Sequence, residues 1–118
     1  KIKALGEFMN KKYIIKKNEE IEVIVKKGKK RVSKYFIIYM VNNDKDYNMY
    51  CVSVSKKLGK ANVRNKIKRR TKDILMKNKI DLGKKYVIII RKEALTVSYK
   101  ELEESLIKEI KGERNEKY

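Results

Sequence analysis

One segment, residues 53–72, constrains the fold and the partner of this chain more than any other. It reads SVSKKLGKANVRNKIKRRTK, an apolar strand-like stretch that passes through a Gly turn into a helix. Nine Lys or Arg residues lie from Lys56 to Lys72, and no acidic residue occurs between Asp46 and Asp73. A helix that needed only solubility would alternate Glu with Lys, because like charges three or four residues apart destabilise it. The segment therefore predicts a strand followed by a helix that binds a polyanion.

The helical spacing of this segment separates an apolar stripe from a basic face. At about 100° per residue, Val63, Ile67 and Ile74 share one narrow stripe that we expect to pack on a core. The opposite face carries a basic and amide set suited to phosphates and to a base or sugar: Arg64 on its flank, Asn65, Lys68, Arg69 and Lys72. A solvated basic face without a ligand is the alternative that charge and periodicity leave open.

The composition indicates a nucleic-acid partner. The chain has 33 basic and 15 acidic residues, a net charge of +18, and no His. Such an imbalance predicts binding to nucleic acid or to an anionic membrane, and no apolar run approaches the roughly 18 residues of a membrane span. Without His or paired carboxylates at metal-binding spacing, we expect no catalytic residue and no dedicated metal site. Cys51, the single cysteine, is compatible with a reducing cytoplasm.

The N-terminal part predicts an extension followed by a short helix. Met9-Asn10-Lys11-Lys12 is typical of a natural start, so residues 1–12 are expected to be an extension, with residues 1–8 either native or artificially added. Asn18 is expected to cap the helix and Gly28 to close it, with Ile21, Ile24 and Val25 facing inward. Alternation of apolar and acidic residues in the same stretch leaves a strand open as the alternative.

Residues 13–118 are expected to form a single RNA-binding α+β domain. Tyr35–Val41 should be a central strand covered on both faces, Met49–Ser55 should return antiparallel, and Tyr86–Arg91 should be another buried strand. A capping box at Ser98–Glu101 opens a last helix. The pattern predicts three helices on one central, mostly antiparallel sheet. If the strands around the basic helix are parallel neighbours, the general rule predicts a right-handed crossover.

The basic segment resembles the protein subunit of bacterial ribonuclease P. The resemblance lies in Lys56-Lys57-Leu58-Gly59, Ala61 and Arg64-Asn65-Lys66-Ile67-Lys68-Arg69, where Lys66 takes the third place of the family's Arg-Asn-Arg core. Supporting matches extend from about Tyr13 to Ile110. The resemblance implies a fold like the second domain of ribosomal protein S5, with a left-handed βαβ crossover. We follow the resemblance on this point.

In that family a large RNA is the catalyst, and the protein is its partner in removing the 5′ leader of precursor tRNA. The resemblance therefore implies the catalytic RNA subunit and precursor tRNA as partners, and Mg²⁺ held mainly by the RNA. We expect no membrane partner and a cytoplasmic protein that is monomeric in isolation. A structural RNA-binding protein of the ribosome is the alternative. A DNA-binding regulator is weaker, because a strand rather than a helix precedes the basic helix.

The resemblance implies two RNA-binding surfaces. One surrounds the basic helix: Lys56, Lys57, Lys60, Arg64, Asn65, Lys66, Lys68, Arg69 and Lys72. The other is a cleft between the first helix and the sheet that holds the leader: Ile21, Val25, Lys34, Tyr35, Ile37 and Tyr39. Strand alternation places the two tyrosines and Ile37 on one face, where aromatic rings can stack on unpaired bases. Ordinary core packing is the alternative for both tyrosines.

Overall fold

The computed structural model describes residues 11–78 and 82–112. The chain forms, in order, η2 (Lys11–Tyr13), α1 (Asn18–Lys27), β1 (Lys29–Val32), β2 (Phe36–Asn42), β3 (Met49–Val54), η3 (Lys56–Leu58), α2 (Ala61–Lys77), β4 (Lys84–Ile90), η4 (Lys92–Leu95) and α3 (Tyr99–Lys111). Most of the expected N-terminal extension, residues 1–12, lies outside the described residues. The expected α+β class with three α-helices and one sheet is confirmed.

The four strands form one mixed sheet in the order β1-β2-β4-β3. The β1–β2 and β2–β4 pairs are antiparallel, and the β3–β4 pair is parallel. Strand β3 runs antiparallel to β2 as expected, but β4 lies between them. Among the four described strands the pairing is therefore mostly antiparallel, and the parallel β3–β4 pair flanks the basic helix α2.

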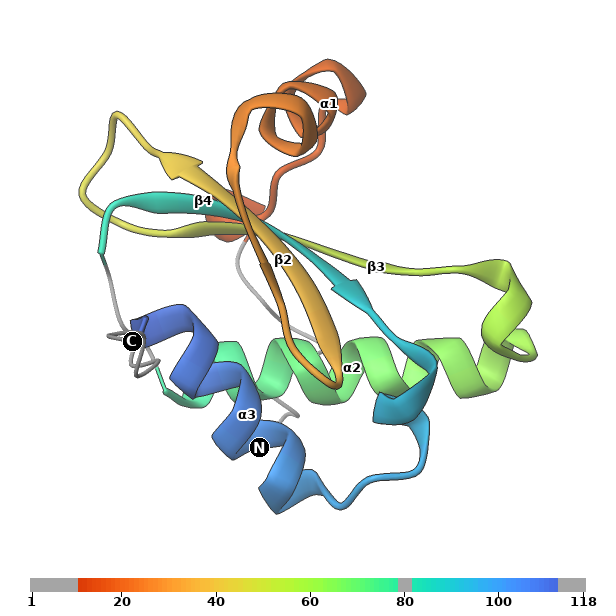
Figure 1. The fold of residues 1–118 in the computed structure, drawn as a ribbon. Coiled ribbons are helices and arrows are strands. Elements are labelled where there is room, and N and C mark those ends of the chain that lie inside the picture. Colours follow the sequence, from red (N-terminus) through yellow and green to blue (C-terminus); the bar gives the residue numbers. More distant parts are fainter. Residues whose placement is uncertain (1–10, 79–81, 113–118) are drawn as a thin grey trace.

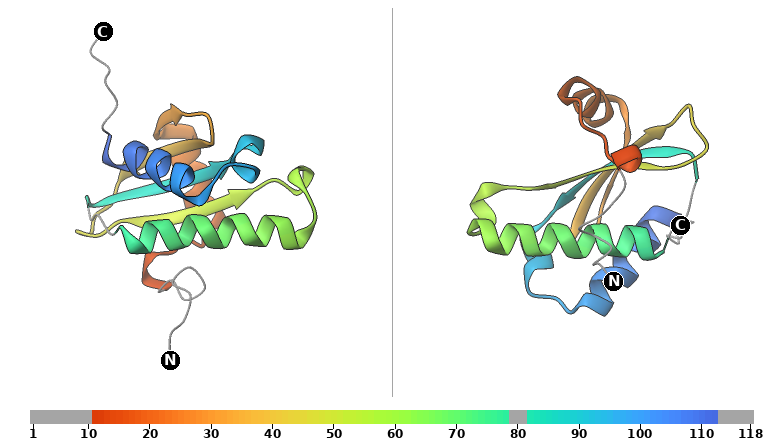
Figure 2. Two further views of the ribbon diagram at one scale, coloured as in Figure 1. Left: turned by 90° about the horizontal axis from the view of Figure 1, so that it is seen from below. Right: turned by 180° about the vertical axis from the view of Figure 1, so that it is seen from behind.

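The β3–α2–β4 connection is a left-handed crossover. Figure 2 (left) views the sheet from the α2 side, with β3 and β4 both running from left to right and β4 above β3. When this view is turned so that the strands point upward, β4 lies to the left of β3. The hand expected from the resemblance is confirmed, whereas the general right-handed rule does not hold here.

The helices lie on both sides of the sheet, with α2 and α3 on one side and α1 alone on the other (Figure 1). Strand β2 alternates accordingly, because Phe36, Ile38 and Met40 are buried in the main core with α2 and α3. Its other face, which carries Ile37 and Tyr39, stays half-exposed. The expectation that this strand is covered on both faces was wrong, since one ten-residue helix cannot cover a four-stranded sheet.

Helix α1 begins at Asn18, one residue earlier than predicted, because Asn18 was expected to be the N-cap residue before the helix. Lys17 is the N-cap residue with an extended backbone, and Asn18 already belongs to the helix without a side-chain cap bond. Ile24 is fully buried and Ile21 half-buried, but Val25 is 37% exposed. Val25 therefore does not face inward as expected, because it lies on the solvent side of the helix.

Gly28 closes α1 for a steric reason. Its φ of −75° is open to any residue. A Cβ at this position would lie 2.5 Å from the Ile24 carbonyl oxygen and 2.8 Å from the Met40 carbonyl oxygen. The glycine thus allows the end of α1 to approach β2 closely.

A buried amide connects two loops at one end of the sheet. Asn48 has no solvent exposure. Its Oδ1 accepts hydrogen bonds from the backbone N–H groups of Leu82 and Lys84, both at 3.0 Å, and its Nδ2 donates to the Tyr50 hydroxyl at 3.1 Å. The side chain therefore satisfies two partly buried backbone N–H groups at the start of β4.

Candidate nucleic-acid interface

The basic helix is preceded by a turn that only glycine readily forms. Ser55 caps η3 by accepting a hydrogen bond from the Lys57 N–H at 3.2 Å. Gly59 follows with φ 154° and ψ −174°, a region that side chains with a Cβ rarely adopt. The Arg64 Nε donates to the Gly59 carbonyl at 3.0 Å. These contacts hold the lysines of η3 beside the start of α2.

The buried stripe of α2 differs in part from the predicted one. Ile67 and Ile74 are buried as expected, together with Thr71 and Leu75. The Thr71 hydroxyl donates to the Ile67 carbonyl at 2.8 Å, so its polar atom is satisfied within the helix. Val63 is 40% exposed, contrary to expectation. It lies in the first turn of α2, where its side chain is beside Gly59.

The predicted RNA-binding residues all lie on η3, the Gly59 turn and α2. Six are exposed and three are half-exposed; the half-exposed ones are Arg64, Lys68 and Lys72. These three follow each other at intervals of four residues, so they form one ridge along the helix. We call Arg64, Lys68 and Lys72 the basic ridge. Lys66 projects from the opposite side of α2, so the structure does not bring it together with the ridge.

The basic ridge borders β3, the edge strand of the sheet. Lys68 and Lys72 line a pocket of about 120 Å³ together with Ile14, Ile15 and residues 50–52. Burial raises the pKa of the Cys51 thiol in its wall, and the two ammonium groups lower it by less. Within the described residues, no ridge side chain forms an ion pair with a carboxylate. The ridge therefore presents charge that no carboxylate of residues 11–78 or 82–112 neutralises.

The structure separates the residues expected to line the leader cleft. Tyr39 is half-exposed on the α1 side of the sheet and packs with Ile21 in a small apolar cluster. Tyr35 is buried on the other side. Strand β2 begins only at Phe36, so the two-residue alternation does not extend back to Tyr35. The expected common face for the two tyrosines was therefore wrong.

Tyr35 packs in the main core and bonds to α3. Its hydroxyl donates to the Glu101 carboxylate of α3 at 2.6 Å, and this hydrogen bond, with burial, raises the pKa of the tyrosine. Lys34 is exposed, and its Nζ lies 5.7 Å from the centroid of the Tyr35 ring.

On the α1 side of the sheet, sequence reasoning missed Lys30. Its Nζ lies 5.7 Å from the centroid of the Tyr39 ring. Only the β1–β2 register, which pairs Lys30 with Tyr39, reveals it.

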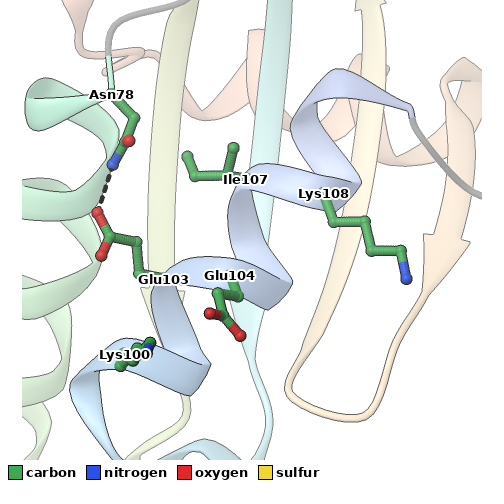
Figure 3. A pocket seen from close by; sticks show the side chains of 6 residues that line it. All are labelled: Asn78, Lys100, Glu103, Glu104, Ile107 and Lys108. Atoms are coloured by element: carbon green, nitrogen blue, oxygen red, sulfur yellow. Dashed lines mark hydrogen bonds between the residues drawn. The ribbon is translucent and has the colours of Figure 1, made fainter.

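The groove between α2 and α3 is lined by both acidic and basic side chains, unlike the basic ridge. Figure 3 shows an open groove there, in which Asn78 donates to Glu103 at 2.7 Å. The groove has a volume of about 490 Å³ and is also lined by Glu104, Lys100, Ile107 and Lys108. Lys77 forms an ion pair with Glu103 at 3.5 Å. The two glutamates make this groove less suitable for RNA phosphates than the basic ridge.

Comparison with known proteins assigns the family. A family model described as Ribonuclease P matches residues 9–112. The chain belongs to the ribonuclease P protein family. A ribonuclease P protein component from Bacillus cereus is 42% identical over 102 residues, which cover 84% of this chain and 89% of the relative. Family membership therefore extends over η2 to α3 and includes both faces of the sheet.

Solved structures of ribonuclease P proteins share the fold. A Staphylococcus aureus RNase P protein mutant with defective mRNA degradation activity has a TM-score of 0.80 at 35% identity, covering 90% of this chain and 93% of that one. The RNase P protein from Thermotoga maritima has a TM-score of 0.77 at 31% identity, covering 82% and 94%. In the ribonuclease P protein described here, no described helix combines the length and apolarity needed to cross a membrane.

Proposed function

We propose that this chain is the protein component of ribonuclease P and that it binds the catalytic RNA subunit and the 5′ leader of precursor tRNA. Together they would form an endoribonuclease that removes the leader and produces the mature tRNA 5′ end. The observation that carries the proposal is the basic ridge: Arg64, Lys68 and Lys72 are not neutralised by carboxylates and lie in the segment that carries the family motif. The ribosomal alternative loses its support, because the comparisons assign the family.

The protein would supply positioning and charge neutralisation rather than the reaction itself. Among the described residues, no group of three His, Cys, Asp or Glu side chains could hold a metal ion. We infer that Mg²⁺ is held mainly by RNA phosphates and that the isolated protein is a monomer in the cytoplasm. The basic ridge and the lysines of η3 would lower the repulsion between the catalytic RNA and its RNA substrate.

The leader would lie on the α1 side of the sheet. Tyr39 offers a half-exposed ring for a base to stack on, and the Lys30 ammonium lies close enough to contact a neighbouring phosphate. Ile21 of α1 supplies apolar contact beside the ring. Tyr35 is not part of this proposed path, because it is buried on the other side of the sheet.

Reconstitution tests the proposed function directly. The isolated protein should not cleave precursor tRNA, whereas the protein with the cognate catalytic RNA and Mg²⁺ should release the leader at the mature 5′ end. The measurement is mapping of the 5′ end of the product under physiological salt. Cleavage at that position by the protein alone, with contaminating RNA excluded by nuclease treatment, would contradict the division of labour.

The basic ridge gives a second expectation. Arg64→Ala and Lys68→Ala should each weaken binding to the catalytic RNA and lower the slope of log K against log salt by about 0.7–0.9 per lost phosphate contact. Circular dichroism should not change, because neither side chain belongs to the buried stripe. Lys100→Ala is the matched control, since it removes one exposed charge beside Glu103 and Glu104. Equal slopes for all three variants and the wild type would show that the ridge is only solvated.

A further inference from the structure

A second basic pocket lies at the end of the sheet opposite the Gly59 turn. The C-terminal end of β4 lies beside the end of β3, which leads into that turn, whereas the pocket lies where β4 begins. Its volume is about 340 Å³. Four of its lining residues are basic: Lys27, Lys29, Arg31 and Lys84. No sequence motif indicated this site, because more than fifty residues separate Lys84 from the other three.

The strand register explains why these side chains converge. Lys29 pairs with Met40, Arg31 with Ile38, and Lys84 with Asn42. The three β2 partners are spaced by two residues, so all three basic side chains project from the same face of the sheet. Lys27 reaches the same place from the last turn of α1.

Among the residues that the structure describes, the charges of this pocket are not neutralised by carboxylates. Lys84 donates to the neutral amide oxygen of Asn42 at 2.9 Å, and Arg31 donates to the Glu109 carbonyl at 3.2 Å. Within the described residues, none of the four basic side chains pairs with a carboxylate. The neighbouring Lys85 behaves differently, because it projects from the other face and forms an ion pair with Glu20 of α1.

This contrast separates two kinds of lysine at the start of β4. Lys85 has a structural partner that holds α1 against the sheet. Lys84 is oriented by Asn42 yet keeps its full charge, as a residue that binds an anion must. An Arg fork and several ammonium groups around one hollow fit a phosphate group, which offers several acceptor oxygens and negative charge.

We propose that the pocket of Lys27, Lys29, Arg31 and Lys84 binds a backbone phosphate of RNA, as a contact separate from the basic ridge. The assignment to RNA rests on the proposed function. The basic ridge borders β3 at one edge of the sheet, whereas the pocket is lined by residues of β1, β2 and the start of β4. The protein would thus hold RNA at two points across the sheet, which restricts its orientation on the RNA.

A charge-matched pair of double variants tests the pocket. Lys27→Gln/Lys29→Gln removes two exposed pocket charges, and Lys92→Gln/Lys100→Gln removes two exposed charges from η4 and α3. Each lost phosphate contact should lower the salt slope by about 0.7–0.9. We expect the pocket variant to lower the slope and the control to keep the wild-type slope, with unchanged circular dichroism for both.

Two binding arms identify the source of the phosphate. Affinity is measured first for the catalytic RNA alone, and then for precursor and mature tRNA with the assembled holoenzyme. A reduced slope in the first arm assigns the pocket to the catalytic RNA, and a reduced slope only with precursor assigns it to the leader. Equal changes in the two double variants, or no change in either arm, would overturn the inference. Failure of the wild-type protein to assemble would instead reject the proposed function, and with it the RNA assignment.

Discussion

Replacing Tyr39 with alanine is expected to weaken binding of precursor tRNA to the holoenzyme by about 1–3 kcal/mol, because one base loses its stacking partner. Affinity for mature tRNA should stay almost unchanged, since the mature product has no leader. The ring is half-exposed on the α1 side of the sheet beside Ile21 and Lys30, so it is accessible to an unpaired base. Equilibrium binding of both RNAs to wild-type and variant holoenzymes is the measurement.

Tyr39→Leu separates stacking from packing. Leucine keeps apolar packing against the cluster of Ile15, Ile24 and Val87 but offers no aromatic face. If stacking holds the leader, Tyr39→Leu should lose almost as much affinity for precursor tRNA as Tyr39→Ala does. Its stability to urea should stay closer to that of the wild type. Equal losses for precursor and mature tRNA, or normal activity of Tyr39→Leu, would assign this tyrosine to packing and place the leader elsewhere.

Replacing Asn48 with leucine is expected to lower the free energy of unfolding by about 2–4 kcal/mol. The change leaves the backbone N–H groups of Leu82 and Lys84 without their acceptor, and an unsatisfied buried donor costs about 1–3 kcal/mol. A typical domain has only about 5–15 kcal/mol in total, so the loss is large. The measurement is the midpoint of urea unfolding at constant salt.

Asn62→Leu is the control for this substitution, because Asn62 is an exposed asparagine in the first turn of α2. Its stability should lie close to that of the wild type. A loss below about 0.5 kcal/mol for Asn48→Leu would mean that water replaces the amide at the two N–H groups. The Asn48→Leu substitution should also affect the second basic pocket. Lys84 of that pocket is the first residue of β4, and its backbone N–H donates to Asn48.

Features with a local physical cause were predictable from the amino-acid sequence. Ser98 caps α3 by accepting from the Glu101 N–H at 3.2 Å, as the capping box predicted. Gly59 and the basic helix follow from turn chemistry and helical spacing over twenty residues, and β2, β3 and β4 follow from β-branched and aromatic runs. Strand β1, Lys29–Val32, has no such run and was not predicted. The left-handed crossover was not accessible in this way, because general strand geometry favours the opposite hand; only the family resemblance pointed to it.

Interactions between distant segments were decided by the tertiary structure. Insertion of β4 between β2 and β3 brings Lys84 beside the lysines of β1, which no local pattern indicates. The register between β1 and β2 pairs Lys30 with Tyr39. Tyr35 lies outside the strand, and its hydroxyl donates to Glu101 of α3. No sequence pattern indicated the role of Asn48, whose buried side chain bonds to the backbone of Leu82 and Lys84. The sequence alone thus determined the three helices, strands β2, β3 and β4, and the basic motif, whose causes lie within a few residues. The pairing order, and with it the two proposed RNA surfaces, depended on how apolar faces far apart in the chain pack together.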